Sequence, residues 1–505
     1  MKNFSIKLFV LLWVIFSANS ISQEIKNNLQ QSAVKQTIVA DFQKELDSIF
    51  NDPNFTNAIW GVVIQSLETG EYVYKRNENI SLMPASNMKL FTTATALTML
   101  GPDYTYTTNL LTNGKIEENV IKGDLIIRGS GDPTFPRRNK DDSLNLLFNS
   151  WIDSLKNIGI TKIQGNIIGD DNCFDDQALG IGWSWDNETY DYSAPTSGLC
   201  YNNNCVDLLI SPGQYVGSTA EVKVHPNTKY ITLHNKIRTV PNDTFTNLDY
   251  YRKSGTNIID AFGVISLRGR TQVEPISIDN PTLYAATVLK EMLEQAGISV
   301  TGSAMDIDDI NSKKEFTNIY QTLNSSSSAP LSEIIKTTNK ISQNLYAEQL
   351  LKTLAKEFEG LGSIGKSVEL QRKFFNEVGI DPDKIEIIDG SGLSRLNLVT
   401  PMQVLAILNY MYHHQYWNEF YNSLPIAGVD GTISGRMKNS KAANNVRAKT
   451  GFINHVRALS GYVTSKDGEV YAFSMIANNY TVPTSLVNNI QDSVCIRLAN
   501  FTRNP

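Results

Sequence analysis

Histidine and cysteine are scarce in this sequence, which has five His and four Cys among 505 residues. The His residues are scattered, and no Cys or His spacing resembles a zinc site. No Gly-x-Ser-x-Gly segment offers a nucleophile elbow, and we interpret His455 as a packing or rim residue. These absences argue against a zinc enzyme and against a Ser-His-Asp hydrolase. We expect neither a metal nor a cofactor.

An excess of positive charge is also missing. The net charge is −6 and the sequence pI is about 5.6, which leaves no broad basic surface and predicts no nucleic-acid partner.

Long apolar runs are lacking as well. The run Leu8–Phe16 is too short to span a bilayer, so no stable membrane span is expected. Lys2 and Lys7 precede it and small residues follow it, which is typical of a signal peptide over residues 1–22. We expect an exported, periplasmic protein; retention of this segment as an anchor is the alternative.

The few cysteines leave disulfide pairing open. Four cysteines in an oxidising compartment allow two bridges in three connectivities. Cys200 and Cys205 are the only pair close enough in sequence to nominate.

A Ser-x-x-Lys motif opens the apolar segment 86–100, which has helical character. Ser86 and Lys89 would lie on one helical face, so the Lys amine could take the proton of the Ser hydroxyl. The apolar body of the segment would desolvate Lys89 and favour its neutral, basic form. We therefore interpret Ser86 as an activated nucleophile and Lys89 as its base.

Two further motifs follow in order, Ser342-Gln343-Asn344 and Lys449-Thr450-Gly451. Each motif alone is weak, because similar strings occur at Ser32/Lys35, Ser363/Lys366 and Lys253-Ser254-Gly255. The first two strings lack a long apolar helix, and the third precedes Ser342 and breaks the order. The ordered trio is therefore the functional signature.

The Lys449-Thr450-Gly451 motif leads into a strand-rich stretch. Residues 458–464 and 470–477 read as consecutive antiparallel strands joined by a tight turn at Asp467-Gly468. This context predicts that the motif lies on a sheet edge.

The three motifs resemble those of the serine penicillin-recognising enzymes, Ser-x-x-Lys, Ser-x-Asn and Lys-Thr-Gly. The long gap between Ser86 and Ser342 must hold extra domain material. In this spacing the chain resembles the D-alanyl-D-alanine carboxypeptidase/endopeptidase group, the low-molecular-mass class C penicillin-binding proteins. Further strings resemble that group: Gly123-Asp124-Leu125, Gly131-Asp132-Pro133-Thr134, Gly182-Trp183-Ser184-Trp185-Asp186, Tyr192-Ser193-Ala194-Pro195, Asp389-Gly390-Ser391-Gly392-Leu393-Ser394-Arg395 and Ala427-Gly428-Val429-Asp430-Gly431-Thr432.

The resemblance implies a role for each motif in acyl transfer. Ser86 would attack the carbonyl of the penultimate D-alanine of a peptidoglycan stem peptide, with Lys89 as proton acceptor. Ser342 would relay a proton toward the leaving amine. Asn344 would hold both the substrate amide and Lys89.

The Lys-Thr-Gly strand would bind the substrate. Lys449 and Thr450 would hold its terminal carboxylate, and the oxyanion would lie between the backbone amides of Ser86 and Phe452. Gly451 would be small so that the substrate can lie along the strand as an added strand. β-Lactam antibiotics would acylate Ser86 as inhibitors.

The expected fold class is α/β, a discontinuous serine β-lactamase/transpeptidase-like catalytic domain, antiparallel sheet with helices, that carries a large inserted β-rich region. We expect catalytic parts at residues 23–101 and 282–505 and an insert, all-β and with two nested modules, at 102–281. A polar segment up to Asn57 precedes a hairpin, and helices are expected at residues 282–296, 331–356, 400–415 and 485–500.

Two further functions stay open. One is a β-lactamase of the same superfamily, disfavoured by the length, the insert and the lack of a clear added Glu-based water site. The other is a non-enzymatic cell-wall-binding scaffold, disfavoured by the intact motifs. In the insert, Asp175 and Asp176 are tentative substrate-binding residues, able to pair with a free amine on the third stem residue. Taken one by one they favour turn or packing roles, whereas the stretch from Asp170 to Asp186 as a whole favours substrate contact. The sequence gives neither the carboxypeptidase-to-endopeptidase balance, nor the diamino acid of the stem peptide, nor the oligomeric state.

Overall fold

The computed structural model describes residues 35–135, 146–310 and 320–503. The predicted signal peptide at residues 1–22 lies outside these ranges. No helix within the described ranges is both long and apolar enough to cross a membrane.

A five-stranded antiparallel sheet forms the base of the catalytic part, in the order β19-β20-β21-β1-β2. The hairpin of β1 (Ile59–Ser66) and β2 (Tyr72–Arg76) pairs through β1 with β21 (Val470–Asn478). β21 pairs with β20 (Val456–Thr464), and β20 pairs with β19 (Arg447–Ile453), which carries the Lys449-Thr450-Gly451 motif. Within this sheet β19 is an edge strand, as the sequence predicts.

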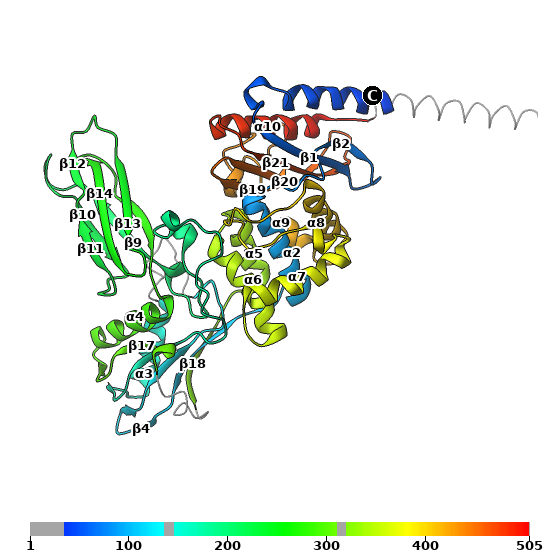
Figure 1. Cartoon of the computed structure of the whole chain (residues 1–505). Helices are drawn as coiled ribbons and strands as arrows, with labels where there is room; N and C mark the ends of the chain where they lie inside the picture. The colour runs from blue at the N-terminus through cyan, green and yellow to red at the C-terminus, as the bar shows by residue number, and fades with distance from the viewer. Residues whose placement is uncertain (1–34, 136–145, 311–319, 504–505) are drawn as a thin grey trace, which may run out of the picture.

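Helices cover both faces of this sheet. A helix over residues 35–50 and α10 (Thr484–Asn500) lie along one face (Figure 1). Phe42 packs against Phe501, with ring centroids 4.5 Å apart. The expectation of only a polar segment before Asn57 is therefore wrong: residues 39, 42, 46 and 50 are buried at helical spacing.

The other face carries the helical layer around Ser86. Its core joins α2 (Met88–Leu100) to α8 (Pro401–His413) and to the helices α5 (Leu331–Lys340), α6 (Asn344–Glu359), α7 (Ile364–Val378) and α9 (Trp417–Ser423). The single helical pattern expected at 331–356 is two helices, broken at residues 341–343. α2 ends at Leu100, as the apolar segment 86–100 predicts, and Gly101 follows as its C-cap with φ of +82°.

The insert is mixed rather than all-β. One part holds two sheets in the orders β16-β7-β5-β4 and β17-β8-β6-β3-β18, with the helices α3 and α4 packed on them. The bounds are β3 (Thr107–Thr112), β4 (Lys115–Glu117), β5 (Val120–Lys122), β6 (Leu125–Arg128), α3 (Leu146–Asn157), β7 (Lys162–Ile163), β8 (Ile167–Asp170), α4 (Pro281–Gln295), β16 (Ser299–Val300), β17 (Ala304–Asp306) and β18 (Gln321–Ser327). Because β18 pairs with β3 and α4 shares this core, the insert runs past the expected boundary at 281.

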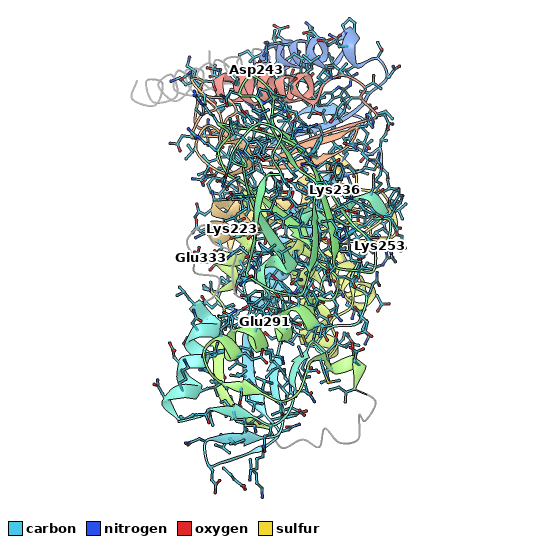
Figure 2. The ribbon with its side chains drawn as sticks, turned by 90° about the vertical axis from the view of Figure 1, so that its left-hand side faces the viewer. Lys223, Lys236, Asp243, Lys253, Glu291 and Glu333 are labelled. Carbon is cyan, nitrogen blue, oxygen red and sulfur yellow. The ribbon has the colours of Figure 1, made fainter. Side chains whose placement is uncertain are left out.

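A β module forms the second part of the insert and projects beside the catalytic part (Figure 1). It has two sheets, β10-β9-β15 and β11-β14-β12 with β13 paired to β14. The bounds are β9 (Cys205–Ser211), β10 (Glu221–His225), β11 (Thr232–Asn235), β12 (Arg238–Val240), β13 (Asn247–Arg252), β14 (Ile258–Ser266) and β15 (Gln272–Ser277). Figure 2 shows Lys223, Lys236 and Lys253 on this module and Glu291 on α4. The Glu291 carboxylate accepts the backbone N–H of Lys229 at 2.9 Å, which ties the module to α4.

The four cysteines, all within the described ranges, are free thiols. The Cys200 thiol contacts the carbonyl of Ser197 and the Cys205 thiol contacts the carbonyl of Asn203. The nominated Cys200–Cys205 bridge is therefore absent, because each sulfur faces a different local carbonyl. Burial raises the pKa of the Cys173 thiol to about 12, so this thiol stays protonated at neutral pH.

Candidate active site

Ser86 lies in a single 3-10 turn, Ala85–Asn87, that leads directly into α2. The residue before it, Ala85, has φ of +46°, a left-handed conformation that a non-glycine residue adopts at a cost of order 1–3 kcal/mol. The Lys89 amine lies 3.0 Å from the Ser86 hydroxyl. The predicted nucleophile and base are therefore within hydrogen-bond distance.

Lys89 is fully buried and donates to three oxygen atoms. Besides Ser86, these are Oδ1 of Asn344 at 2.6 Å and the carbonyl of Ser391 at 2.7 Å. Burial lowers the pKa of Lys89 from 10.5 to about 7, against the opposing attraction of Glu348 and Asp389. A substantial fraction of Lys89 is therefore neutral near physiological pH, as a general base requires.

Ser342 and Asn344 lie where α5 gives way to α6. Ser342 has φ of +62° and breaks the helix, and Asn344 begins α6. The amide nitrogen of Asn344 donates to the carbonyl of Tyr192 in the insert at 2.7 Å. Asn344 thus holds Lys89 through Oδ1, as expected, and its contact with the substrate amide stays a prediction.

The edge strand β19 brings Lys449 to Ser342. The Lys449 amine donates to the Ser342 hydroxyl and to the carbonyl of Thr450, both at 2.8 Å. Lys449 is fully buried, and burial, reinforced by Lys89 and Arg457, lowers its pKa well below 10.5. The Thr450 hydroxyl lies 2.8 Å from that of Thr432.

Gly451 faces the turn at Ala85–Asn87. A Cβ at this position would lie 2.6 Å from the carbonyl of Pro84 and 3.2 Å from the amide nitrogen of Ser86. Access of substrate to the strand stays a prediction as a reason for a glycine here, and the structure adds a second reason, the close approach of two backbones. Phe452 follows and is half exposed.

A loop at residues 389–395 completes the surroundings of Lys89, although its sequence also fits a plain turn. The Asp389 carboxylate accepts the backbone N–H groups of Gly392 at 2.8 Å and Ser394 at 2.6 Å. It also accepts the indole N–H of Trp183 at 2.9 Å. Sequence reasoning missed the Ser391 carbonyl as a partner of Lys89, and its only signal was the resemblance of the Asp389–Arg395 string to the family.

Asp175 and Asp176 are not placed beside the nucleophile. Asp175 pairs with the buried amine of Lys352 at 2.7 Å, and Lys352 lies on α6 about 12 Å along the helix axis from Asn344. Asp176 lies next to Asp308, whose pKa is raised to about 6 by burial and by neighbouring acidic groups. Their recognition role stays a prediction, and Asp175 already has a cationic partner.

Among the described residues, one group of acidic side chains has oxygen atoms close enough to surround a cation. It comprises Asp171, Asp306 and Asp308, with ligand atoms within 4.8 Å of one another, and it lies in the insert rather than at Ser86.

Three comparisons relate the chain to known proteins. The model of the D-Ala-D-Ala carboxypeptidase 3 (S13) family matches residues 42–501. The D-alanyl-D-alanine carboxypeptidase of Actinomadura sp. (strain R39) is 31% identical, over 92% of this chain and 85% of that protein. The D-alanyl-D-alanine carboxypeptidase DacB of Haemophilus influenzae is 28% identical, over 83% of this chain and 85% of that protein.

A solved structure agrees with these relatives. The crystal structure of penicillin binding protein 4 (dacB) from Haemophilus influenzae superposes with a TM-score of 0.78 and 25% identity, covering 90% of this chain and 99% of that chain. The family match extends over both catalytic parts and the insert between them. The chain therefore belongs to the D-Ala-D-Ala carboxypeptidase 3 (S13) family.

Proposed function

We propose that the chain is a serine D,D-carboxypeptidase and D,D-endopeptidase that acts on peptidoglycan stem peptides through an acyl-enzyme on Ser86. The observation that carries the proposal is the buried Lys89 amine, 3.0 Å from the Ser86 hydroxyl and with a pKa lowered to about 7. A neutral amine at that distance activates a hydroxyl for attack on an amide carbonyl. The N-terminal pattern at residues 1–22 supports a periplasmic location.

In the acylation step Ser86 Oγ forms a bond to the carbonyl carbon of the penultimate D-alanine, and its proton passes to Lys89. Collapse of the tetrahedral intermediate breaks the peptide bond, and the leaving amine takes up a proton through Ser342. The hydrogen bond from Lys449 to Ser342 supports that relay. Water then hydrolyses the ester and regenerates Ser86.

The edge of β19 suits the substrate backbone. β19 pairs with β20 on one side, and a bridge between Ile426 and Arg447 occupies the start of its other side, so an extended peptide can add beyond Ala448. The backbone N–H groups of Ser86 and Phe452 would hold the oxyanion, and the Thr450 hydroxyl with the Lys449 charge would hold the terminal carboxylate.

Benzylpenicillin tests the nucleophile directly, because a β-lactam acylates an activated serine and leaves a stable adduct. Intact-mass spectrometry should show one adduct, absent in Ser86→Ala and retained in Ser363→Ala, which carries the second Ser-x-x-Lys motif within the described ranges. Labelling that persists in Ser86→Ala would exclude this nucleophile.

Two substrates separate the proposed activities from a β-lactamase. A D-Ala-D-Ala peptide should release D-alanine and a cross-linked muropeptide should release monomers. Rapid turnover of penicillin without peptide cleavage would instead identify a β-lactamase, and adduct formation with neither activity would leave a binding scaffold.

A further inference from the structure

Glu348 is a buried carboxylate that the proposed mechanism does not use. It lies on α6 four residues after Asn344, so both side chains leave the same helical face toward α2. Only 1% of its surface is exposed, and burial followed by the neighbouring Asp389 raises its pKa to about 7. A carboxylate so deeply buried is costly unless its environment repays the desolvation.

The partners of Glu348 are two consecutive backbone amides. Its two carboxylate oxygens accept the N–H groups of Gly390 at 3.0 Å and Ser391 at 2.8 Å. The carbonyl of the same Ser391 accepts the Lys89 amine at 2.7 Å. Glu348 therefore reaches Lys89 through a single residue of backbone.

α2 holds the other side of this backbone. The Thr92 hydroxyl, three residues after Lys89, donates to the carbonyl of Gly390 at 2.7 Å. A Cβ on Gly390 would lie 2.6 Å from the carbonyl of Ala347, so only glycine allows this loop so close to α6. With both N–H groups and both carbonyls bonded, Gly390 and Ser391 have little freedom to rotate.

Among the described residues, the charged groups that act on Lys89 come from three elements. Glu348 on α6 and Asp389 in the loop attract its ammonium form, whereas Lys449 on β19 repels it. Of these groups, Glu348 exerts the largest attraction. Removing its charge should make Lys89 lose its proton more easily.

We infer that Glu348 is a positioning residue that fixes the Gly390–Ser391 backbone against Lys89 and sets how readily Lys89 releases its proton. This inference rests on the proposed function, since it concerns the base that activates Ser86. Glu348 is bonded to the loop and not to Ser86, so it acts through the loop and through its charge.

The test is the pH profile of the acylation rate constant with benzylpenicillin, measured separately from the binding constant. Glu348→Gln should move the midpoint of that profile down by at most about one pH unit, because the ionised fraction of a carboxylate that attracts the Lys89 ammonium is lost. Thr92→Val loosens the same loop without changing charge, so it should slow acylation and leave the midpoint in place. Glu359→Gln, an exposed position on the same helix, should change neither quantity.

An unchanged midpoint in a folded Glu348→Gln protein would overturn the inference. If that variant does not fold, as judged by its melting temperature, Glu348→Asp serves instead. Its shorter side chain cannot reach both N–H groups, so acylation should slow at every pH, and an unchanged rate would overturn the inference. A Ser86 adduct that forms normally in these variants leaves the proposed function standing, whereas no adduct in the unsubstituted protein would overturn both.

Discussion

Lys89 combines full burial with three oxygen partners, and this combination determines how the site should respond to pH. Its pKa is lowered to about 7, so the ammonium form dominates below pH 7 and the free amine above it. Because the proposed acylation step needs the free amine, we expect the acylation rate constant to rise with pH and to level off above a midpoint near 7. Stopped-flow acylation by a chromogenic β-lactam checks this, and a rate that falls across the same interval would contradict it.

Removal of Lys89 should be far more damaging than a pH change. Lys89→Ala should lower acylation by about 10²-fold or more at all substrate concentrations, since it removes the general base. Retained folding is the necessary control, because Asn344 and the Ser391 carbonyl lose a partner in this variant. An acylation rate within a few fold of the unsubstituted protein would refute Lys89 as base.

Replacing Lys449 should lower the activity to an extent that depends on the substrate. Its amine donates to the Ser342 hydroxyl and to the Thr450 carbonyl, so we expect it to serve both the proton relay and the binding of the substrate carboxylate. Lys449→Ala should slow cleavage of acid-terminated peptides more than cleavage of their amidated analogues. Equal losses on both peptides would leave only the contact with Ser342 as its role.

At the scale of the elements, the backbone of the loop at 389–395 packs against the backbone of the turn at Ala85–Asn87. Gly392 has φ of +82°, and a Cβ there would lie 1.9 Å from the carbonyl of Ala85. Gly360 at the end of α6 has the same φ but nothing within 4 Å. Gly360→Ala should cost only the backbone penalty of about 1 kcal/mol, whereas Gly392→Ala should cost more and also lower the acylation rate. Denaturant melts and acylation rates of the two variants test this, and equal effects would contradict the close packing.

The loop that holds Asp175 and Asp176 gives a second element-scale test. Asp175→Asn leaves the buried Lys352 amine without its carboxylate and should destabilise the protein by about 3 kcal/mol. Asp176→Asn removes a like charge beside Asp308 and should cost little or stabilise. The melting temperatures of the two variants test this, and equal changes would contradict the expected difference.

Recognition needs a separate measurement. The double variant, compared on a stem peptide with a free side-chain amine and on its acetylated form, shows whether these carboxylates contact substrate. Unchanged discrimination between the two peptides would assign both residues to the structure of the insert.

Over the whole molecule, sequence reasoning predicted the elements whose pattern is local. The β1–β2 hairpin, the strands β20 and β21 around Gly468, and the closing helix α10 follow from alternation, turn residues and helical spacing. The family strings led to Ser86, Lys89, Ser342 and Lys449, which the structure brings together. The helix at 35–50 was missed because polar residues between its buried positions hid the spacing.

The sequence could not predict the contacts that backbone atoms make, or the burial that depends on residues far apart in the chain. The Ser391 carbonyl on Lys89 and the Tyr192 carbonyl on Asn344 depend on no particular side chain, so no motif marks them. The extent of the insert was misjudged for a related reason: α4 reads as an ordinary amphipathic helix, and only its packing on β8 and β17 assigns it to the insert.

The order of the strands determines when the site can form during synthesis of the chain. β1 is made early but pairs with β21, and the turn around Ser86 packs against Gly451 on β19, so both wait for the last part of the chain. A nascent or prematurely terminated polypeptide has the nucleophile and lacks the strand that shapes its surroundings. Penicillin labelling should therefore appear only on full-length chains, which makes the antibiotic a reporter of completed synthesis.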